Sequence, residues 1–252
     1  MVLQAEEGLI TPSVRVLVAT AVPAERNAVA GAFPGAGAGA GESALPGTVR
    51  VVHAATGFDL LAAGVGPALA AASTATALTA AALAGRPYGL VVSAGIGGGF
   101  QPAAPLGSLV VADAITAADL GAETADGFLP VTEIGFGTVT HRPPKSLVRV
   151  ACRATGARAG TVLTVSTVTG TAARAAELRD RHPGALAEGM EGFGVAEAAA
   201  AHGVPVLEVR AVSNPVGPRD RAAWRIGDAL TALTEAFGKL PPALESWNPH
   251  DH

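Results

Sequence analysis

The chain has 252 residues, a length that α/β folds often reach as a single domain, and 49% of its residues are hydrophobic, enough to fill one large core. Only 4% are aromatic, so Ala, Val and Leu must build that core, and helices can pack closely on a sheet. The net charge of −4, without a block of like charges, argues against nucleic-acid or anionic-membrane partners and leaves small-molecule chemistry as the leading class.

Strand and helix patterns alternate along the first half of the chain. The expected elements are a flexible leader (1–13), a strand (14–19), a helix (24–33), a flexible low-complexity loop (34–47), two strands (49–54 and 59–63) around the turn signal Thr56-Gly57, a helix (68–84) and a strand (90–94) that runs into a glycine-rich loop (95–99). The leader lacks the basic start and long apolar run of a signal peptide. Ser and Thr interrupt the Ala-rich stretch 68–84, which therefore reads as a buried helix and not as a membrane span.

The second half continues the same alternation. The expected elements are a strand (109–115), a helix (145–154), a strand (161–165), two helices (172–181 and 192–201), a strand (206–212) and a closing helix (221–237), followed by a flexible tail (241–252). This order predicts one α/β domain over 14–240, with a largely parallel or mixed sheet flanked by helices. Cys152, the single cysteine, is expected in a helix as an inert thiol, which suits a reducing cytoplasm.

Ligands of such sheets bind in the loops that follow the carboxyl ends of the strands. One of these loops is the glycine run Gly95-Ile96-Gly97-Gly98-Gly99. It lacks the Lys-Ser/Thr ending of a P-loop, and Pro102 and Pro105 interrupt any helix after it. Two interpretations stay open, a backbone that approaches a ligand closely and a simple tight turn.

Three charged residues stand near the other expected strand ends. Glu25 and Glu191 fit the first turn or start of a helix, where a solvated carboxylate is favoured. Arg210 lies inside an otherwise apolar strand, where a charge needs a partner or a water-lined site. Each residue alone has an ordinary structural explanation, but their common position at strand ends favours a site.

The ordered motifs of the chain resemble those of the methylthioadenosine/S-adenosylhomocysteine nucleosidase family and its purine nucleoside phosphorylase relatives. The motifs are Thr20-Ala21-Val22-Pro23-Ala24-Glu25, Ser93-Ala94-Gly95-Ile96-Gly97-Gly98, Gly189-Met190-Glu191-Gly192 and Arg210-Ala211-Val212-Ser213-Asn214. The resemblance spans residues 15–237 and implies a three-layer α/β/α sandwich with a central mixed, partly barrelled sheet. It also implies a homodimer or a higher homo-oligomer.

The same resemblance implies roles for individual residues. Glu25 falls where the family has its water-activating carboxylate, and Arg210 where a cation helps to hold that water. Met190 falls where a side chain packs on the ribose, and Glu191 where an acid accepts both ribose hydroxyls. The other implied substrate contacts are Gly95, Ile96, Gly97, Val168, Thr169 and Ser213. Cleavage of an N-glycosidic bond requires no metal or other cofactor, and the histidines show no metal-ligand spacing.

Asn214 replaces the aspartate of adenine-specific members. An asparagine amide can donate to a 6-oxo group and accept from a protonated N7, so we expect a 6-oxopurine such as hypoxanthine as the leaving group and Asn214 as a catalytic residue. With the run 213–220 and Trp224, this change resembles the branch of the family that hydrolyses futalosine in the alternative menaquinone pathway. Futalosine carries an aryl carboxylate beyond the ribose, and Arg219, Trp224 and Arg225 are the expected residues of that 5′ side.

Three other functions remain open on sequence grounds. A purine nucleoside phosphorylase also uses asparagine on 6-oxopurines, but the apolar Gly95-Ile96-Gly97 offers no phosphate cradle. A methylthioadenosine-type nucleosidase would fit if Asn214 were misaligned. A nucleoside-binding module without turnover would not need the pair of Glu25 and Arg210.

Overall fold

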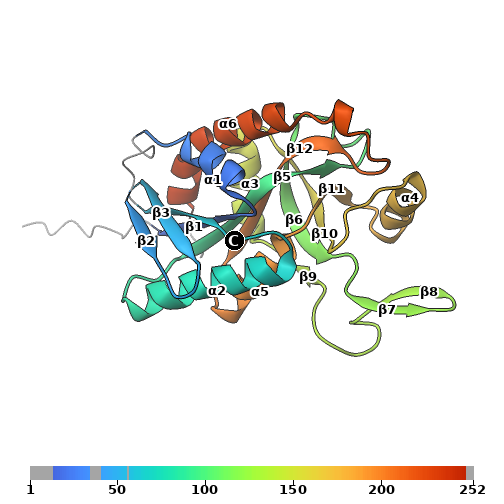
Figure 1. The fold of residues 1–252 in the computed structure, drawn as a ribbon, viewed down its shortest axis with the longest axis horizontal. Coiled ribbons are helices and arrows are strands. Elements are labelled where there is room, and N and C mark those ends of the chain that lie inside the picture. The colour runs from blue at the N-terminus through green and yellow to red at the C-terminus, as the bar shows by residue number, and fades with distance from the viewer. Residues whose placement is uncertain (1–13, 35–40, 56, 248–252) are drawn as a thin grey trace, which may run out of the picture.

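A computed structural model of the chain describes residues 14–34, 41–55 and 57–247. The predicted leader 1–13 lies outside the described residues, as do 35–40 of the predicted loop, Thr56 of the predicted turn and 248–252 of the predicted tail. Within the described ranges, one large sheet lies between two layers of helices (Figure 1). The predicted α/β/α sandwich is confirmed.

The large sheet has ten strands. The strands of the chain are β1 (Val16–Thr20), β2 (Glu42–Ala44), β3 (Arg50–Ala55), β4 (Phe58–Ala62), β5 (Leu90–Gly99), β6 (Leu109–Ala117), β7 (Gly121–Thr124), β8 (Gly127–Pro130), β9 (Thr140–His141), β10 (Arg158–Thr164), β11 (Ala185–Gly189) and β12 (Val206–Pro215). Their order in the sheet is β11-β10-β6-β12-β5-β1-β4-β3-β2, with β9 paired to β6. Parallel pairs such as β1 with β5 and antiparallel pairs such as β12 with β6 make the sheet mixed, as predicted.

Half of this sheet closes into a barrel. β11 pairs with β10 on one edge and with β5 on the other, so that β11, β10, β6, β12 and β5 form a ring. The glycine run makes this closure possible, because a Cβ at Gly97 would lie 2.6 Å from the carbonyl oxygen of Glu188 on β11. The run was expected to be a loop after the strand 90–94, which is wrong. It is the second half of β5, where absent side chains let strands approach.

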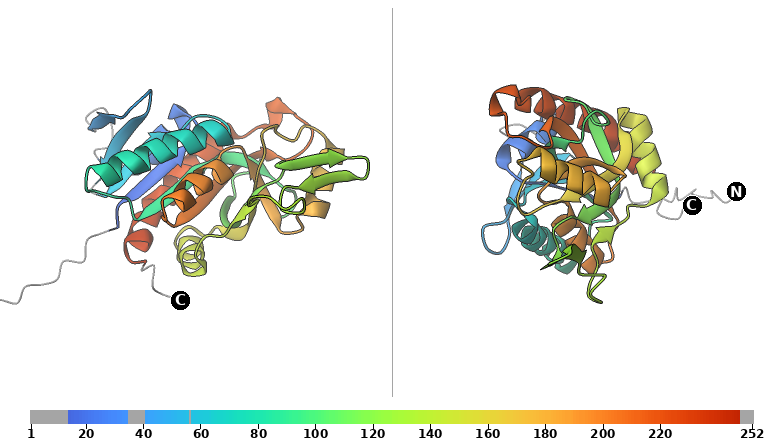
Figure 2. Two further views of the ribbon diagram at one scale, coloured as in Figure 1. Left: turned by 90° about the horizontal axis from the view of Figure 1, so that it is seen from below. Right: turned by 90° about the vertical axis from the view of Figure 1, so that its right-hand side faces the viewer.

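Helices cover both faces of the sheet. They are α1 (Pro23–Ala30), α2 (Pro67–Leu83), α3 (Lys145–Thr155), α4 (Ala172–Arg181), α5 (Gly192–Ala201) and α6 (Ile226–Glu245), with a 3₁₀ turn at Arg221–Ala223. α2 and α5 contribute to the apolar core on one face, and α1, α3 and α6 to the core on the other (Figures 1 and 2). The bounds predicted for α4 and α5 are confirmed, and no described helix is long and apolar enough to cross a membrane.

Two predicted flexible segments contain regular structure. Residues 42–44 of the expected loop 34–47 form the edge strand β2, which pairs with β3. The closing helix was expected to end at 237, before the Pro241-Pro242 pair, but it continues to Glu245. Leu244 and Trp247 of the expected tail are buried, and the Trp247 indole Nε1 donates to Ser146 Oγ at 3.0 Å. Burial of these side chains offsets the helix-breaking tendency of the prolines.

The sequence analysis missed the short strands. β7 and β8 form a two-stranded hairpin that projects from the body of the molecule (Figure 2). β9 has two residues, and β11 has five, preceded by Gly184 and ending at Gly189. Such short runs carry little periodicity, and long-range pairing decides their structure.

Candidate functional site

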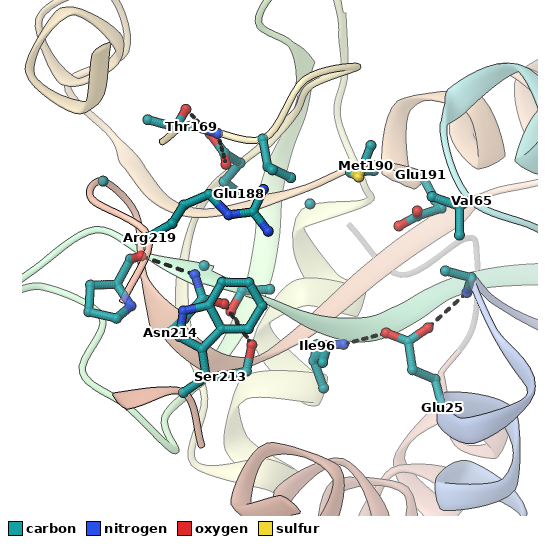
Figure 3. Close-up of a pocket in the computed structure, with 18 of the residues that line it drawn as sticks. Glu25, Val65, Ile96, Thr169, Glu188, Met190, Glu191, Ser213, Asn214 and Arg219 are labelled. Atoms are coloured by element: carbon teal, nitrogen blue, oxygen red, sulfur yellow. Dashed lines mark hydrogen bonds between the residues drawn. The ribbon is translucent and has the colours of Figure 1, made fainter. Parts of the chain in front are cut away.

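A cavity of about 340 Å³ opens where β1, β5 and β12 reach their carboxyl ends. It is lined by Ala21, Val22, Glu25, Val65, Ile96, Gly97, Gly98, Val168, Thr169, Glu188, Gly189, Met190, Glu191, Ser213, Asn214, Pro215, Gly217, Pro218, Arg219 and Trp224. Figure 3 shows that Glu25 and Glu191 lie at one end of it and Asn214 at the other. The topology therefore brings together residues from six separate segments, most of them at or near strand ends.

Glu25 is fixed at the first turn of α1. Pro23 starts this helix at a position where its missing N–H costs nothing, and the Glu25 carboxylate reaches back to the helix start. Its Oε2 accepts from the backbone N–H groups of Ala21 at 2.9 Å and Val22 at 3.3 Å, and its Oε1 accepts from Ile96 N at 2.9 Å. The side chain is buried but lines the cavity, so a held carboxylate faces the space where a ligand would lie.

Glu191 occupies the residue before α5 and is also buried. Its Oε1 accepts from Gly66 N at 3.2 Å, and its Oε2 lies 3.4 Å from Arg210 Nη1. Met190 precedes it on the cavity wall. The two carboxylates and the thioether therefore share one end of the cavity (Figure 3).

Arg210 is buried on β12 and is not among the residues that line the cavity. Its Nε donates to Glu208 Oε1 at 2.8 Å, and Glu208 is fully buried beside it. Burial by itself disfavours the charged guanidinium, but the nearby carboxylates of Glu208, Glu191 and Glu25 outweigh that effect and raise the pKa of Arg210. Burial raises the pKa of Glu208, because it disfavours the charged carboxylate, and the positive charge of Arg210 opposes this shift.

Gly95 lies behind the site and not on its wall. A Cβ at this position would lie 2.6 Å from Glu25 Oε1 and 2.8 Å from Arg210 Nη1. Gly95 was expected to contact substrate, but the structure gives it a different place, between the carboxylate and the guanidinium. Ile96 and Gly97 do line the cavity, as predicted.

Ser213 and Asn214 lie at the other end, on the last residues of β12 and not in a loop after it. Ser213 Oγ can donate to Asn214 Oδ1 at 2.9 Å or to the carbonyl oxygen of Gly97 at 3.2 Å. Asn214 Nδ2 donates to the carbonyl oxygen of Pro215 at 3.0 Å, which leaves its second N–H free to bind a ligand.

Glu188 is a buried carboxyl group in this cavity that the sequence analysis missed. Thr169 donates to it twice, from its backbone N to Oε1 at 2.9 Å and from its Oγ1 to Oε2 at 2.5 Å. Burial raises the pKa of Glu188, although the Thr169 hydrogen bonds oppose the shift. The available signal was an acidic residue in the apolar run 185–189, the same signal that selected Arg210. Val168 and Thr169 line the cavity as predicted.

The residues expected on the 5′ side do not lie together. Arg219 and Trp224 line the Asn214 end of the cavity, with the Arg219 guanidinium carbon 5.4 Å from the Trp224 ring centre (Figure 3). Arg225 does not line the cavity, and its exposed Nη1 lies 3.9 Å from Asp228 Oδ2. The turn after Pro215 folds back over the end of the sheet, a path that sequence order alone does not specify.

Comparison with known proteins identifies related sequences and folds. A model of the phosphorylase superfamily matches residues 15–240. Futalosine hydrolase of Streptomyces coelicolor is 77% identical over 235 residues, 93% of this chain and 98% of that protein. Futalosine hydrolase of Acidothermus cellulolyticus is 48% identical over 92% of both chains. The fold resembles the methylthioadenosine/S-adenosylhomocysteine nucleosidase of Colwellia psychrerythraea in complex with adenine, with a TM-score of 0.73 and 20% identity over 90% of this chain and 96% of that one.

Proposed function

Because this chain belongs to the phosphorylase superfamily and, within it, to the futalosine hydrolases, we propose that it uses water to split the N-glycosidic bond of futalosine. The products are hypoxanthine and dehypoxanthine futalosine, a step of menaquinone biosynthesis by the futalosine route. The structural observation that carries this proposal is the cavity with two buried carboxylates at one end and an asparagine amide at the other.

The Glu25 end performs the attack on the sugar. As the bond between C1′ and N9 breaks, positive charge develops on the ribose, and the Glu25 carboxylate draws a proton from the water whose oxygen bonds to C1′. Three backbone N–H groups already hold this carboxylate in place, so little reorganisation is needed. Glu191 accepts the ribose hydroxyls and fixes the sugar against the water.

The Asn214 end stabilises the leaving base. The electron pair of the broken bond moves to the purine, which leaves with a proton on N7. Asn214 donates its free N–H to O6 and accepts from the protonated N7 through Oδ1. An amide cannot supply a full proton, so water delivers that proton to N7.

Arg210 acts as a positioning residue in this proposal, which revises its expected role of holding the water. Its Nη1 lies 3.4 Å from Glu191 Oε2, and it is absent from the cavity wall. The guanidinium offsets the negative charges of Glu25 and Glu191 in a space where unpaired charges would be costly.

Hydrolysis fits the cavity better than phosphorolysis. A phosphate nucleophile would have to lie beside the Glu25 carboxylate, which would repel it. Among the described residues that line the cavity, the one arginine is Arg219, which lies at the opposite end. We therefore expect the rate to be independent of phosphate.

Self-association belongs to the same proposal, as a homodimer or a higher homo-oligomer. Large apolar side chains are exposed on and beside the projecting β7–β8 hairpin, namely Leu120, Leu129, Ile134 and Phe136, the last with 69% of its surface accessible. A second copy of the chain would cover them. Light scattering should give a multiple of the chain mass, and Phe136→Glu should shift it toward the monomer, whereas Leu83→Glu, on the far end of α2, should not.

We also place the reaction in the cytoplasm, because the substrate is a nucleoside and Cys152 is a free thiol.

One assay tests the proposed hydrolysis of futalosine. Pure protein is incubated with futalosine, inosine or methylthioadenosine, with and without phosphate, and the released base is identified. Hypoxanthine from futalosine at equal rates with and without phosphate is expected. Adenine as the preferred product, or a requirement for phosphate, would overturn the proposal.

A further inference from the structure

Glu188 lines the base end of the cavity, away from the groups that attack the sugar. Figure 3 shows Glu188 and Thr169 on the Asn214 side and Glu25 at the opposite end. The carboxyl group is 95% buried, since its relative exposure is 5%. Among the described residues it forms no ion pair within 4.0 Å. A buried carboxyl without a cation is costly, and the hydrolysis described above does not use it.

The strand register places Glu188 and Asn214 on either side of one glycine. Gly98 of β5 pairs with Glu188 of β11 on one edge and with Asn214 of β12 on the other. Two strand spacings separate the outer residues, or roughly 10 Å between their Cα atoms. All three residues line the cavity. Because Gly98 has no side chain, the space between the Glu188 and Asn214 side chains stays open. A flat purine edge fits between an amide and a carboxyl group held in this row.

Thr169 fixes the direction in which the carboxyl group can act. It occupies one lone pair on each oxygen, through the bonds of 2.9 and 2.5 Å. Each carboxylate oxygen has a further lone pair, and both Thr169 and Glu188 line the cavity. The remaining capacity of Glu188 is therefore that of an acceptor for a ligand N–H.

A 6-oxopurine has such an N–H at N1, next to the O6 atom to which Asn214 donates in the proposed function. Hypoxanthine carries a hydrogen on N1 and an acceptor at O6, whereas adenine carries a lone pair on N1 and a donor at position 6. We infer that Glu188 accepts the N1–H of the purine and is, with Asn214, a specificity-determining residue of this site. This inference rests on the proposed function. An adenine base would set its N1 lone pair against the carboxylate and lose the hydrogen bond as well.

The test compares Glu188→Gln with wild type on two substrates that differ at one edge, futalosine and its 6-amino analogue. Gln keeps the size of the side chain and can donate to the N1 lone pair. We expect kcat/KM for futalosine to fall on the order of tenfold to a hundredfold, and the ratio of 6-amino to 6-oxo kcat/KM to rise by at least as much. Glu235→Gln on the exposed face of α6 is the matched control and should change neither value.

Titration calorimetry with the free bases supplies a readout that does not require turnover. Wild type should bind hypoxanthine more tightly than adenine, and Glu188→Gln should reduce or reverse that preference. Equal losses for both substrates, with an unchanged base preference, would overturn the inference. If wild type binds hypoxanthine more tightly than adenine but does not hydrolyse futalosine, the proposed function fails, while the assignment of Glu188 as the acceptor of the purine N1–H is retained.

Discussion

Glu25 and Arg210 face each other across Gly95, a position at which any side chain would touch both. The Glu25 Oε1 and Arg210 Nη1 atoms lie 2.6 and 2.8 Å from where a Cβ would stand. The strand β5 thus separates the Glu25 carboxylate from the buried Arg210 guanidinium by the width of a bare backbone. This relationship joins the first and last motifs of the sequence in one charge cluster.

Gly95→Ala should therefore damage the site. The added methyl group must push Glu25 or Arg210 aside, which we expect to reduce kcat by at least about tenfold and to cost about 1–3 kcal/mol of unfolding free energy. Kinetics and denaturant titration measure the two effects. Gly238→Ala, on α6 with no atom within 4 Å of the new Cβ, is the control and should stabilise by about 0.5–1 kcal/mol. A Gly95→Ala enzyme with normal kcat would show that this spacing is not critical.

Glu25→Gln should reduce kcat by about a hundredfold to ten-thousandfold, because an amide cannot take a proton from water. The folded structure should persist, since Oε1 can still accept from Ile96 N. Turnover of futalosine and the thermal unfolding midpoint are the measurements. Glu235→Gln on the exposed face of α6 should behave as wild type. Near-normal turnover by Glu25→Gln would remove this residue from the mechanism.

Discrimination between 6-oxo and 6-amino substrates should weaken in acid. Burial raises the pKa of Glu188, Thr169 opposes the shift by hydrogen bonding, and the charges of Arg174 and Asp119 act in opposite directions. The ionised carboxylate that accepts N1–H exists above this pKa and is lost as the pH falls through it. The ratio of 6-oxo to 6-amino kcat/KM should therefore fall as the pH drops through the pKa of Glu188, which lies above that of an exposed glutamate, about 4.3.

Rate profiles for both substrates between pH 4.5 and 8 measure that ratio. A pH effect on the attack at the sugar acts on both substrates and cancels in the ratio. Glu188→Gln should give a ratio that does not vary with pH. A wild-type ratio that is equally flat would contradict the assignment of Glu188.

Substitution of each of the two tryptophans should affect a different property, the unfolding free energy for Trp247 and the KM for Trp224. Trp247→Ala removes a buried side chain and its hydrogen bond to Ser146, so we expect a loss of about 3–5 kcal/mol of unfolding free energy. Trp224→Ala truncates a partly exposed ring on the cavity wall and should raise KM with little change in stability. Denaturant titration and steady-state kinetics of both variants measure this contrast. Equal stability of the two variants would mean that the end of α6 does not anchor the fold.

The order of the elements and the chemistry of the site could be read largely from residue types. Alternating apolar patterns identified most strands and helices, because each long element buries one or two faces and must repeat its apolar residues accordingly. The motifs around Glu25, Glu191 and Asn214 predicted two carboxylates and an amide in one cavity, which the structure describes. These features are local, so neighbouring residues carry their signal.

Only the tertiary structure decided how those pieces meet. Closure of β11 onto β5 turned the glycine run from an expected loop into a strand and brought Glu188 opposite Asn214 across Gly98. It also placed Arg219 and Trp224 at the Asn214 end of the cavity and Arg210 behind the cavity wall. The physical reason is that strand pairing and burial depend on residues far apart in the chain, and no local pattern states which edges will pair.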